Sequence, residues 1–156
     1  MIGRLLLIMV VVLPLISAAA SAWLSRRRPQ RVPAISVAAS LLLVLLVSVA
    51  IPDTRIDVVA GREITLLPEA QLGIQLLGLA MLGFVLACGN MEGWEGRATD
   101  WLTFAWLSLG GLVLSLVIRN LPIALLFFFA ASMLWAQALP PDDRRRAAAA
   151  TLRYLM

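Results

Sequence analysis

The side chains that could do chemistry in this sequence fall into two groups, a short acidic loop and a set of neutral polar residues inside apolar runs. The loop carries Glu92, Glu95, Arg97 and Asp100. Carboxylates can act as general acids or bases, so the three acids are the candidate residues for a membrane enzyme. The alternative is that this loop is solvated or contacts a partner subunit.

The polar residues inside the apolar runs are all neutral. Proton or ion transport within a membrane generally uses an ionisable side chain at mid-depth, because its energetic cost is tolerated only for function. A neutral group instead hydrogen-bonds to a neighbouring helix or carbonyl, a contact worth about 0.6–2 kcal/mol. We predict this packing role for all of them and assign no catalytic residue. They are Gln75, Cys88, Thr103, Ser108, Ser115, Ser132 and Gln137.

The composition also argues against cofactors and nucleic acid. The chain has no His and a single Cys, so a zinc, haem or iron–sulfur site built by this chain alone is not expected. We therefore assign no metal-binding residue, no cofactor-binding residue and no cofactor. The 13 basic residues are all Arg and cluster between apolar runs, where they anchor helix ends rather than contact nucleic acid.

The elements that must position these residues are five apolar runs of about 18–20 residues. A helix rises about 1.5 Å per residue, so each run can cross a hydrocarbon core of about 30 Å. The chain is 62% hydrophobic with a mean hydropathy of +0.94, above the roughly 45–50% apolar content of soluble domains. The sequence therefore predicts an all-α integral membrane protein with about five transmembrane helices. The expected spans are 5–24, 34–51, 72–89, 101–118 and 121–139.

The expected membrane domain covers residues 1–139, and residues 140–156 begin a further helix or form a cytoplasmic tail. The first run resembles a signal peptide because Arg4 precedes it, but it is long and ends in an arginine cluster typical of a stop-transfer segment. We predict a retained span kinked at Pro14. Cleavage of this run is the alternative and would leave four spans.

Between the second and third spans, residues 54–67 read TRIDVVAGREITLL. Ile56 and Val58 lie before Gly61, and Ile64 and Leu66 lie after it. This spacing predicts two short strands around a turn. We place this β-hairpin at the external membrane surface, because its charged residues are too close to the turn to enter lipid.

Small residues at four-residue spacing predict three faces for close helix packing. The first face is Ser17, Ala18, Ser21 and Ala22; the others are the pairs Gly83/Ala87 and Gly111/Ser115. Trp101 and Trp106 are expected to lie at the membrane interface as anchors. Arg119 and Asn120 form a tight turn that makes the fourth and fifth spans antiparallel neighbours.

The arginine distribution predicts the orientation. Four arginines lie on the amino-terminal side of the five spans and nine on the other. Cytoplasmic loops carry an excess of positive charge, so the amino terminus and the hairpin are expected outside and the carboxyl end in the cytoplasm. Arg144–Arg146 are expected to anchor this topology or to bind anionic lipid. The first set is Arg4, Arg55, Arg62 and Arg119; the second is Arg26, Arg27, Arg28, Arg31, Arg97, Arg144, Arg145, Arg146 and Arg153.

The order of these features resembles the amino-terminal third of the antiporter-like membrane subunits of respiratory complex I (NADH-quinone oxidoreductase). Related proteins are the multisubunit cation/proton antiporters and the membrane-bound hydrogenases. The shared order runs from an Arg-rich loop and a hairpin to the loop MEGWEGR, the run LGGLVLS, a tight turn and an aromatic fifth span. The resemblance implies that Ala147–Tyr154 opens a sixth helix. It also implies a prokaryotic inner or plasma membrane with the amino terminus outside.

The chain departs from that family at its proton-handling residues. The family's fifth helix carries a Glu, and the resemblance places Ala130 or Ala131 there. An Asp near the start of the family's third helix corresponds to Glu69-Ala70. The later Lys-bearing helices have no counterpart, and this chain has no Lys. The resemblance therefore implies a shortened relative, either a truncated gene product or a remnant that docks against another subunit.

These observations predict a structural or accessory membrane subunit of a proton-translocating quinone oxidoreductase or a related antiporter complex. Such a subunit would not conduct protons by itself, and its enzymatic role would be at most that of a non-catalytic subunit. Its partners would be the lipid bilayer and other membrane subunits. The alternative is a small independent integral membrane protein, either a homo-oligomeric transporter or an assembly factor.

Overall fold

The computed structural model describes residues 2–58, 62–89 and 98–138. In these ranges the chain forms five α-helices and a two-stranded antiparallel hairpin, as the sequence predicts, and also one 3₁₀ turn. The helices are α1 (Ile2–Arg27), α2 (Val32–Val49), α3 (Pro68–Gly89), α4 (Ala98–Val117) and α5 (Leu121–Ala138). The 3₁₀ turn is η1 (Pro29–Arg31), and the strands are β1 (Thr54–Val58) and β2 (Arg62–Leu66).

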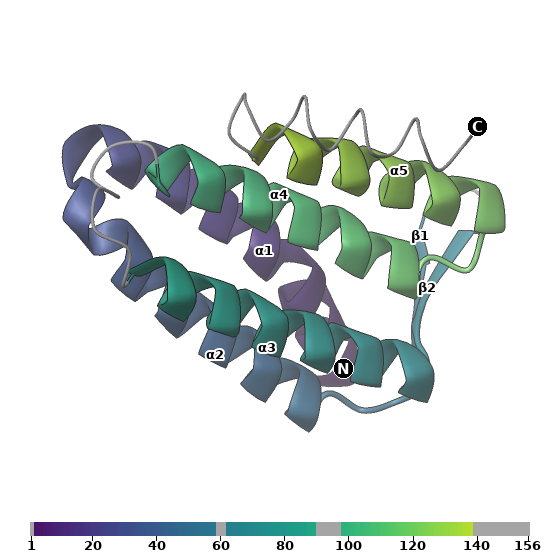
Figure 1. The fold of residues 1–156 in the computed structure, drawn as a ribbon. Coiled ribbons are helices and arrows are strands. Elements are labelled where there is room, and N and C mark those ends of the chain that lie inside the picture. The colour runs from purple at the N-terminus through teal and green to yellow at the C-terminus, as the bar shows by residue number, and fades with distance from the viewer. Residues whose placement is uncertain (1, 59–61, 90–97, 139–156) are drawn as a thin grey trace, which may run out of the picture.

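The helices pack as a bundle in which chain neighbours run in opposite directions (Figure 1). Helix α4 packs against both α1 and α5, and α2 packs against both α1 and α3. Helix α3 also contacts α4, so helices α1, α2, α3 and α4 form a closed ring of contacts, and α5 packs on the outside of α4. The antiparallel packing of α4 and α5 through the turn at residues 118–120 confirms the prediction made from that turn.

Prolines set the ends of two helices. Pro33 lies in the first turn of α2, where its missing N–H costs no helical hydrogen bond. Helix α3 begins at Pro68 with Glu69 in its first turn, one turn before the predicted span at residue 72. A proline and an acid suit a helix start, because the exposed N–H groups there favour negative charge.

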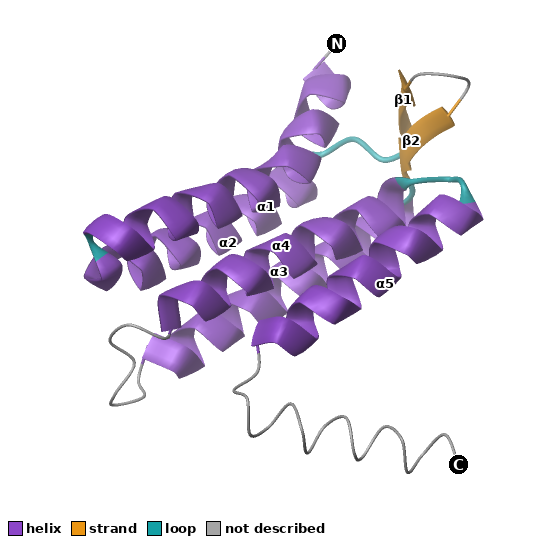
Figure 2. Ribbon diagram, turned by 90° about the horizontal axis from the view of Figure 1, so that it is seen from above, coloured by secondary structure: helices purple, strands orange, loops and turns teal. Residues whose placement is uncertain are grey.

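Helix α1, with 26 residues, is longer than the other helices of the described ranges. It runs without a break through Pro14, which is buried. Figure 2 shows that α1 changes direction along its course. Proline removes one helical hydrogen bond and displaces a carbonyl, so the bend agrees with the predicted kink.

The hairpin is attached to the end of the bundle where α4 ends (Figure 1). Ile64 pairs with Ile118 in an isolated antiparallel bridge, and Arg119 Nη1 lies 3.5 Å from Glu63 Oε2. On the other side, the backbone N–H of Asp53 donates to the Leu66 carbonyl over 2.8 Å. The hairpin therefore links the α2–β1 turn to the α4–α5 turn. The Arg119 side chain is 63% exposed and that of Glu63 is 36% exposed, so solvent screens the pair and it adds at most about 1 kcal/mol.

Apolar side chains cover the outside of the bundle as well as its core. Three helical segments are long and apolar enough to cross a membrane: Ile2–Arg27, Val32–Val49 and Pro68–Ala87. A third or less of each of these windows is buried inside the bundle. The apolar parts described in α4 and α5 are shorter, Trp101–Val117 and Leu121–Leu134. The helices are therefore compatible with a membrane protein.

Candidate functional site

The acidic loop lies mostly outside the described residues. Glu92, Glu95 and Arg97 are not among them, and Asp100 belongs to the first turn of α4 with its side chain undescribed. The side chains of Cys88 and Gln137 and all of residues 139–156, with Arg144–Arg146, are also outside. Within the part of the chain that the structure describes, no three His, Cys, Asp or Glu side chains gather as a metal site requires.

The described serines of α4 and α5 donate to backbone carbonyls. Ser108 Oγ donates to the Ala131 carbonyl over 2.8 Å, which links α4 to α5. Ser115 and Ser132 donate to carbonyls of their own helices, those of Leu112 and Phe128. Each hydroxyl proton is therefore used in a bond to a backbone carbonyl, as predicted, and the Ser108 bond alone of these three joins two helices.

Two glutamines at the start of α3 bind the end of α2. Gln71 Nε2 donates to the Val47 carbonyl over 2.8 Å and to the Ala50 carbonyl over 3.3 Å. Gln75 Nε2 lies 3.2 Å from Ser48 Oγ. The last carbonyls of a helix lack the usual partner within the helix. Gln71 supplies a donor to the carbonyl of the C-cap residue Ala50, and it adds a second donor to the Val47 carbonyl, which also accepts the Ala50 N–H. The prediction for Gln75 is confirmed, and the more extensive role of Gln71 was not foreseen.

Trp106 does not lie at an interface, contrary to the prediction. Its side chain is fully buried, and the indole N–H donates to Ser36 Oγ in α2 over 3.1 Å. Ser40 Oγ in turn donates to the Ser36 carbonyl over 2.8 Å. The prediction was wrong because α4 turns this face toward α2. The four-residue spacing of Ser36 and Ser40 marks a polar face on α2, but it does not show which helix covers that face.

Three of the four residues of the predicted small-residue face of α1 are buried, and the fourth, Ala22, is partly exposed. Ser17, Ala18 and Ser21 are each at most 4% exposed. Ser17 Oγ donates to the Leu13 carbonyl over 2.8 Å. Ser21 Oγ has no hydrogen-bond partner among the described residues. These small side chains let α1 approach its neighbours closely.

The two predicted glycine faces differ in whether a neighbouring helix contacts them. A methyl group on Gly111 would lie 2.9 Å from Ala131 Cβ and 3.3 Å from the Phe127 carbonyl oxygen, so α4 and α5 touch there. Gly83 has nothing within 4 Å, and both Gly83 and Ala87 are exposed. The Gly111 face is therefore confirmed as a contact. The Gly83/Ala87 pair makes no helix contact within the described chain, because α3 turns it outward.

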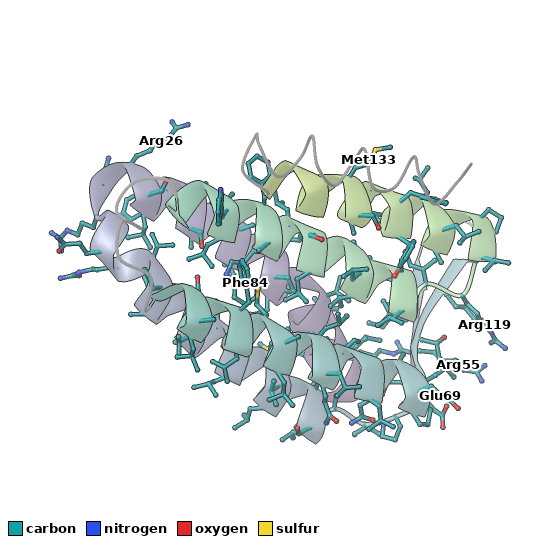
Figure 3. All side chains as sticks on the ribbon, viewed as in Figure 1. Arg26, Arg55, Glu69, Phe84, Arg119 and Met133 are labelled. Atoms are coloured by element: carbon teal, nitrogen blue, oxygen red, sulfur yellow. The ribbon has the colours of Figure 1, made fainter. Side chains whose placement is uncertain are left out.

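A groove of about 610 Å³ opens between α3, α4 and α5. Figure 3 shows Phe84 reaching from α3 into the space toward α4. The two polar residues that line the groove are Ser108 and Ser132, and both of their hydroxyls donate to backbone carbonyls. The groove therefore suits apolar groups. Its lining is Leu77, Ala80, Met81, Phe84, Ala105, Ser108, Leu109, Leu112, Phe128 and Ser132.

The positions singled out by the family resemblance lie in different surroundings. Ala131 is fully buried against Gly111, and its carbonyl accepts the Ser108 hydroxyl. Ala130 is exposed on the outer face of α5. Glu69 is exposed at the hairpin end of the bundle, beside the buried Ala70 (Figure 3). Comparison of the chain with protein-family models, curated proteins and solved structures finds no match.

Proposed function

We propose that this chain is a structural subunit of a multisubunit membrane complex, of the complex I-like or antiporter class that its sequence resembles. All five helices would cross a prokaryotic inner membrane. The hairpin would lie outside and the α1–α2 turn in the cytoplasm. The subunit would hold partner helices in place and would not carry protons by itself.

The observation that carries this proposal is the contact between Gly111 and Ala131. The resemblance places the family's proton-handling acid at Ala130 or Ala131. At Ala131 the two helices approach so closely that even a methyl group on Gly111 would be crowded. The Ser108 hydroxyl donates to the Ala131 carbonyl beside this contact. The Gly111–Ala131 contact and the Ser108 hydrogen bond support tight packing of α4 on α5 rather than a hydrated path between these helices.

The outer surface of the bundle supports membrane partners. Large apolar side chains such as Leu76, Leu126 and Phe129 are more than 60% exposed. Lipid or apolar helices of other subunits would cover such surfaces at little cost, because bilayer chains are as apolar as leucine. The groove between α3, α4 and α5 and the open face at Gly83 leave room for close approach.

The orientation can be tested with two single cysteines in a Cys88→Ser background. Arg55 in β1 and Gln30 in the α1–α2 turn are exposed at opposite ends of the bundle. A membrane-impermeant maleimide should label Arg55→Cys in intact cells and Gln30→Cys only after permeabilisation. The Arg55 change lowers positive charge on the outer side and therefore favours the expected topology. The reverse labelling pattern would refute the orientation.

The assignment to a complex can be tested by tagging the chain and extracting it in mild detergent. On a native gel it should migrate with a much larger assembly, and affinity purification should recover subunits of a quinone oxidoreductase or antiporter complex. Gly111→Leu is the matched variant, because it should loosen the α4–α5 contact and reduce recovery. Migration as a lone small protein would contradict the proposal. A pure homo-oligomer would instead favour the independent transporter.

A further inference from the structure

The arginines at the α1–α2 connection form the most strongly charged patch on the described surface. We call residues 26–31 the arginine turn; its four arginines are Arg26, Arg27, Arg28 and Arg31. Their combined charge equals the chain's net charge of +4, because the remaining arginines equal the acidic residues in number. The turn therefore accounts for the whole charge imbalance of the protein.

The backbone holds these side chains within one compact turn. The N–H of Arg28 donates to the Leu24 carbonyl over 2.7 Å, and the N–H of Arg31 donates to the Arg28 carbonyl over 3.1 Å. All four arginines are exposed. The ion pair formed among the described residues lies elsewhere, between Arg119 and Glu63, so no described carboxylate neutralises the turn.

A tryptophan fixes one of these guanidinium groups at a defined depth. Arg27 Cζ lies 4.9 Å from the centroid of the Trp23 ring, and Trp23 is 57% exposed. Exposed tryptophans near the end of a membrane helix lie at the level of lipid headgroups. The stacked Arg27 would therefore lie where lipid phosphates are found, since guanidinium forks bind phosphate in a bidentate manner.

The start of α2 adds a second attraction for an anion. Arg31 is the N-cap residue of α2 and makes no side-chain cap, and the first turn holds no acid. The helix dipole favours Arg26 and Arg27 at the end of α1 but disfavours a cation at the start of α2. An anion between the two helix ends would compensate both the positive end of the α2 dipole and the arginine charge.

We propose that the arginine turn binds the phosphate of an anionic phospholipid. The inference rests on the proposed membrane location but not on the identity of any partner complex. Phosphatidylglycerol carries the net charge that phosphatidylcholine lacks, so the site should distinguish these two lipids when their acyl chains are identical. The attraction should weaken with added salt, because exposed charges are screened.

The test is native mass spectrometry of the full chain in mixed micelles containing equal amounts of phosphatidylglycerol and phosphatidylcholine. The wild-type chain should retain phosphatidylglycerol preferentially. Arg27→Gln/Arg31→Gln should weaken that binding by about fivefold per arginine, the effect of about 1 kcal/mol for each charge near an anionic lipid. The matched control is Arg4→Gln/Arg55→Gln, which removes the same charge at the hairpin end and should change little.

Three results would overturn the proposal. These are equal retention of both lipids, equal losses in the two double variants, or displacement of the bound phosphatidylglycerol when inorganic phosphate is added to the micelles. The last result would assign the site to a free anion. A circular dichroism spectrum matching the wild type should accompany both variants, since all four changed side chains are exposed. A chain that passes the cysteine-labelling test but shows no lipid preference refutes this inference alone.

Discussion

Trp106→Ala is expected to lower the free energy of unfolding by about 3–5 kcal/mol, the usual cost of removing a large buried aromatic side chain. Trp106 is the largest of the fully buried side chains in the described part of the chain. The change also removes the hydrogen bond from its indole to Ser36 Oγ. Unfolding in mild detergent, followed by far-ultraviolet circular dichroism during titration with a denaturing detergent, would measure the loss.

Two further variants separate the contribution of the buried ring from that of the indole hydrogen bond. Trp106→Phe keeps most of the ring volume and removes the N–H group, so it should cost about 1 kcal/mol. Trp23→Ala removes an exposed tryptophan that stacks with Arg27, and it should cost no more than about 1 kcal/mol. Equal losses from Trp106→Ala and Trp23→Ala would show that Trp106 is not part of the core.

Trp106 also shows what the sequence could not reveal. A tryptophan near the end of an apolar run is typical of an interfacial anchor, and that was the prediction. Its true surroundings depend on Ser36, which lies 70 residues earlier in the chain. Periodicity within one helix shows which residues share a face, but not which other helix covers that face. The error therefore came from tertiary packing rather than from the helix assignment.

The elements themselves could be predicted because their signals are local. Long apolar runs, prolines at helix starts and the turn around Gly61 gave five helices and a hairpin with the strands in the expected order. Helix α1 begins at Ile2 and α3 at Pro68, slightly before the predicted spans. Hydropathy marks the apolar part of a helix, whereas the polar first turn of α3 is set by Pro68 and Glu69.

The described neutral polar residues Gln75, Ser108, Ser115 and Ser132 make the predicted hydrogen bonds to a backbone carbonyl or a neighbouring helix, for a simple chemical reason. A serine inside a helix can donate to a carbonyl of the preceding turn, as Ser17, Ser40 and Ser132 do. The inter-helix bonds of Gln71 and Ser108 needed the structure. Which carbonyl lies within reach depends on how two helices are rotated against each other, and sequence spacing leaves that rotation open.

Gly111→Leu is expected to lower the free energy of unfolding by about 3 kcal/mol, at the upper end of the range for overpacked interiors. Even a methyl group at Gly111 would lie 2.9 Å from Ala131 Cβ and 3.3 Å from the Phe127 carbonyl oxygen. The backbone oxygen cannot move without shifting α5. The larger leucine must therefore separate α4 from α5 and weaken the bond from Ser108 to the Ala131 carbonyl.

Gly83→Leu is the matched control, because it makes the same change in a helix of similar composition. Gly83 has nothing within 4 Å and is exposed. In the purified chain this change should be neutral or stabilise by about 0.5–1 kcal/mol, since leucine favours helix more than glycine does. Detergent-denaturation midpoints of the two variants would give the comparison. Similar midpoints would mean that α4 and α5 do not meet at Gly111, which would remove the main support for a closed, non-conducting α4–α5 layer.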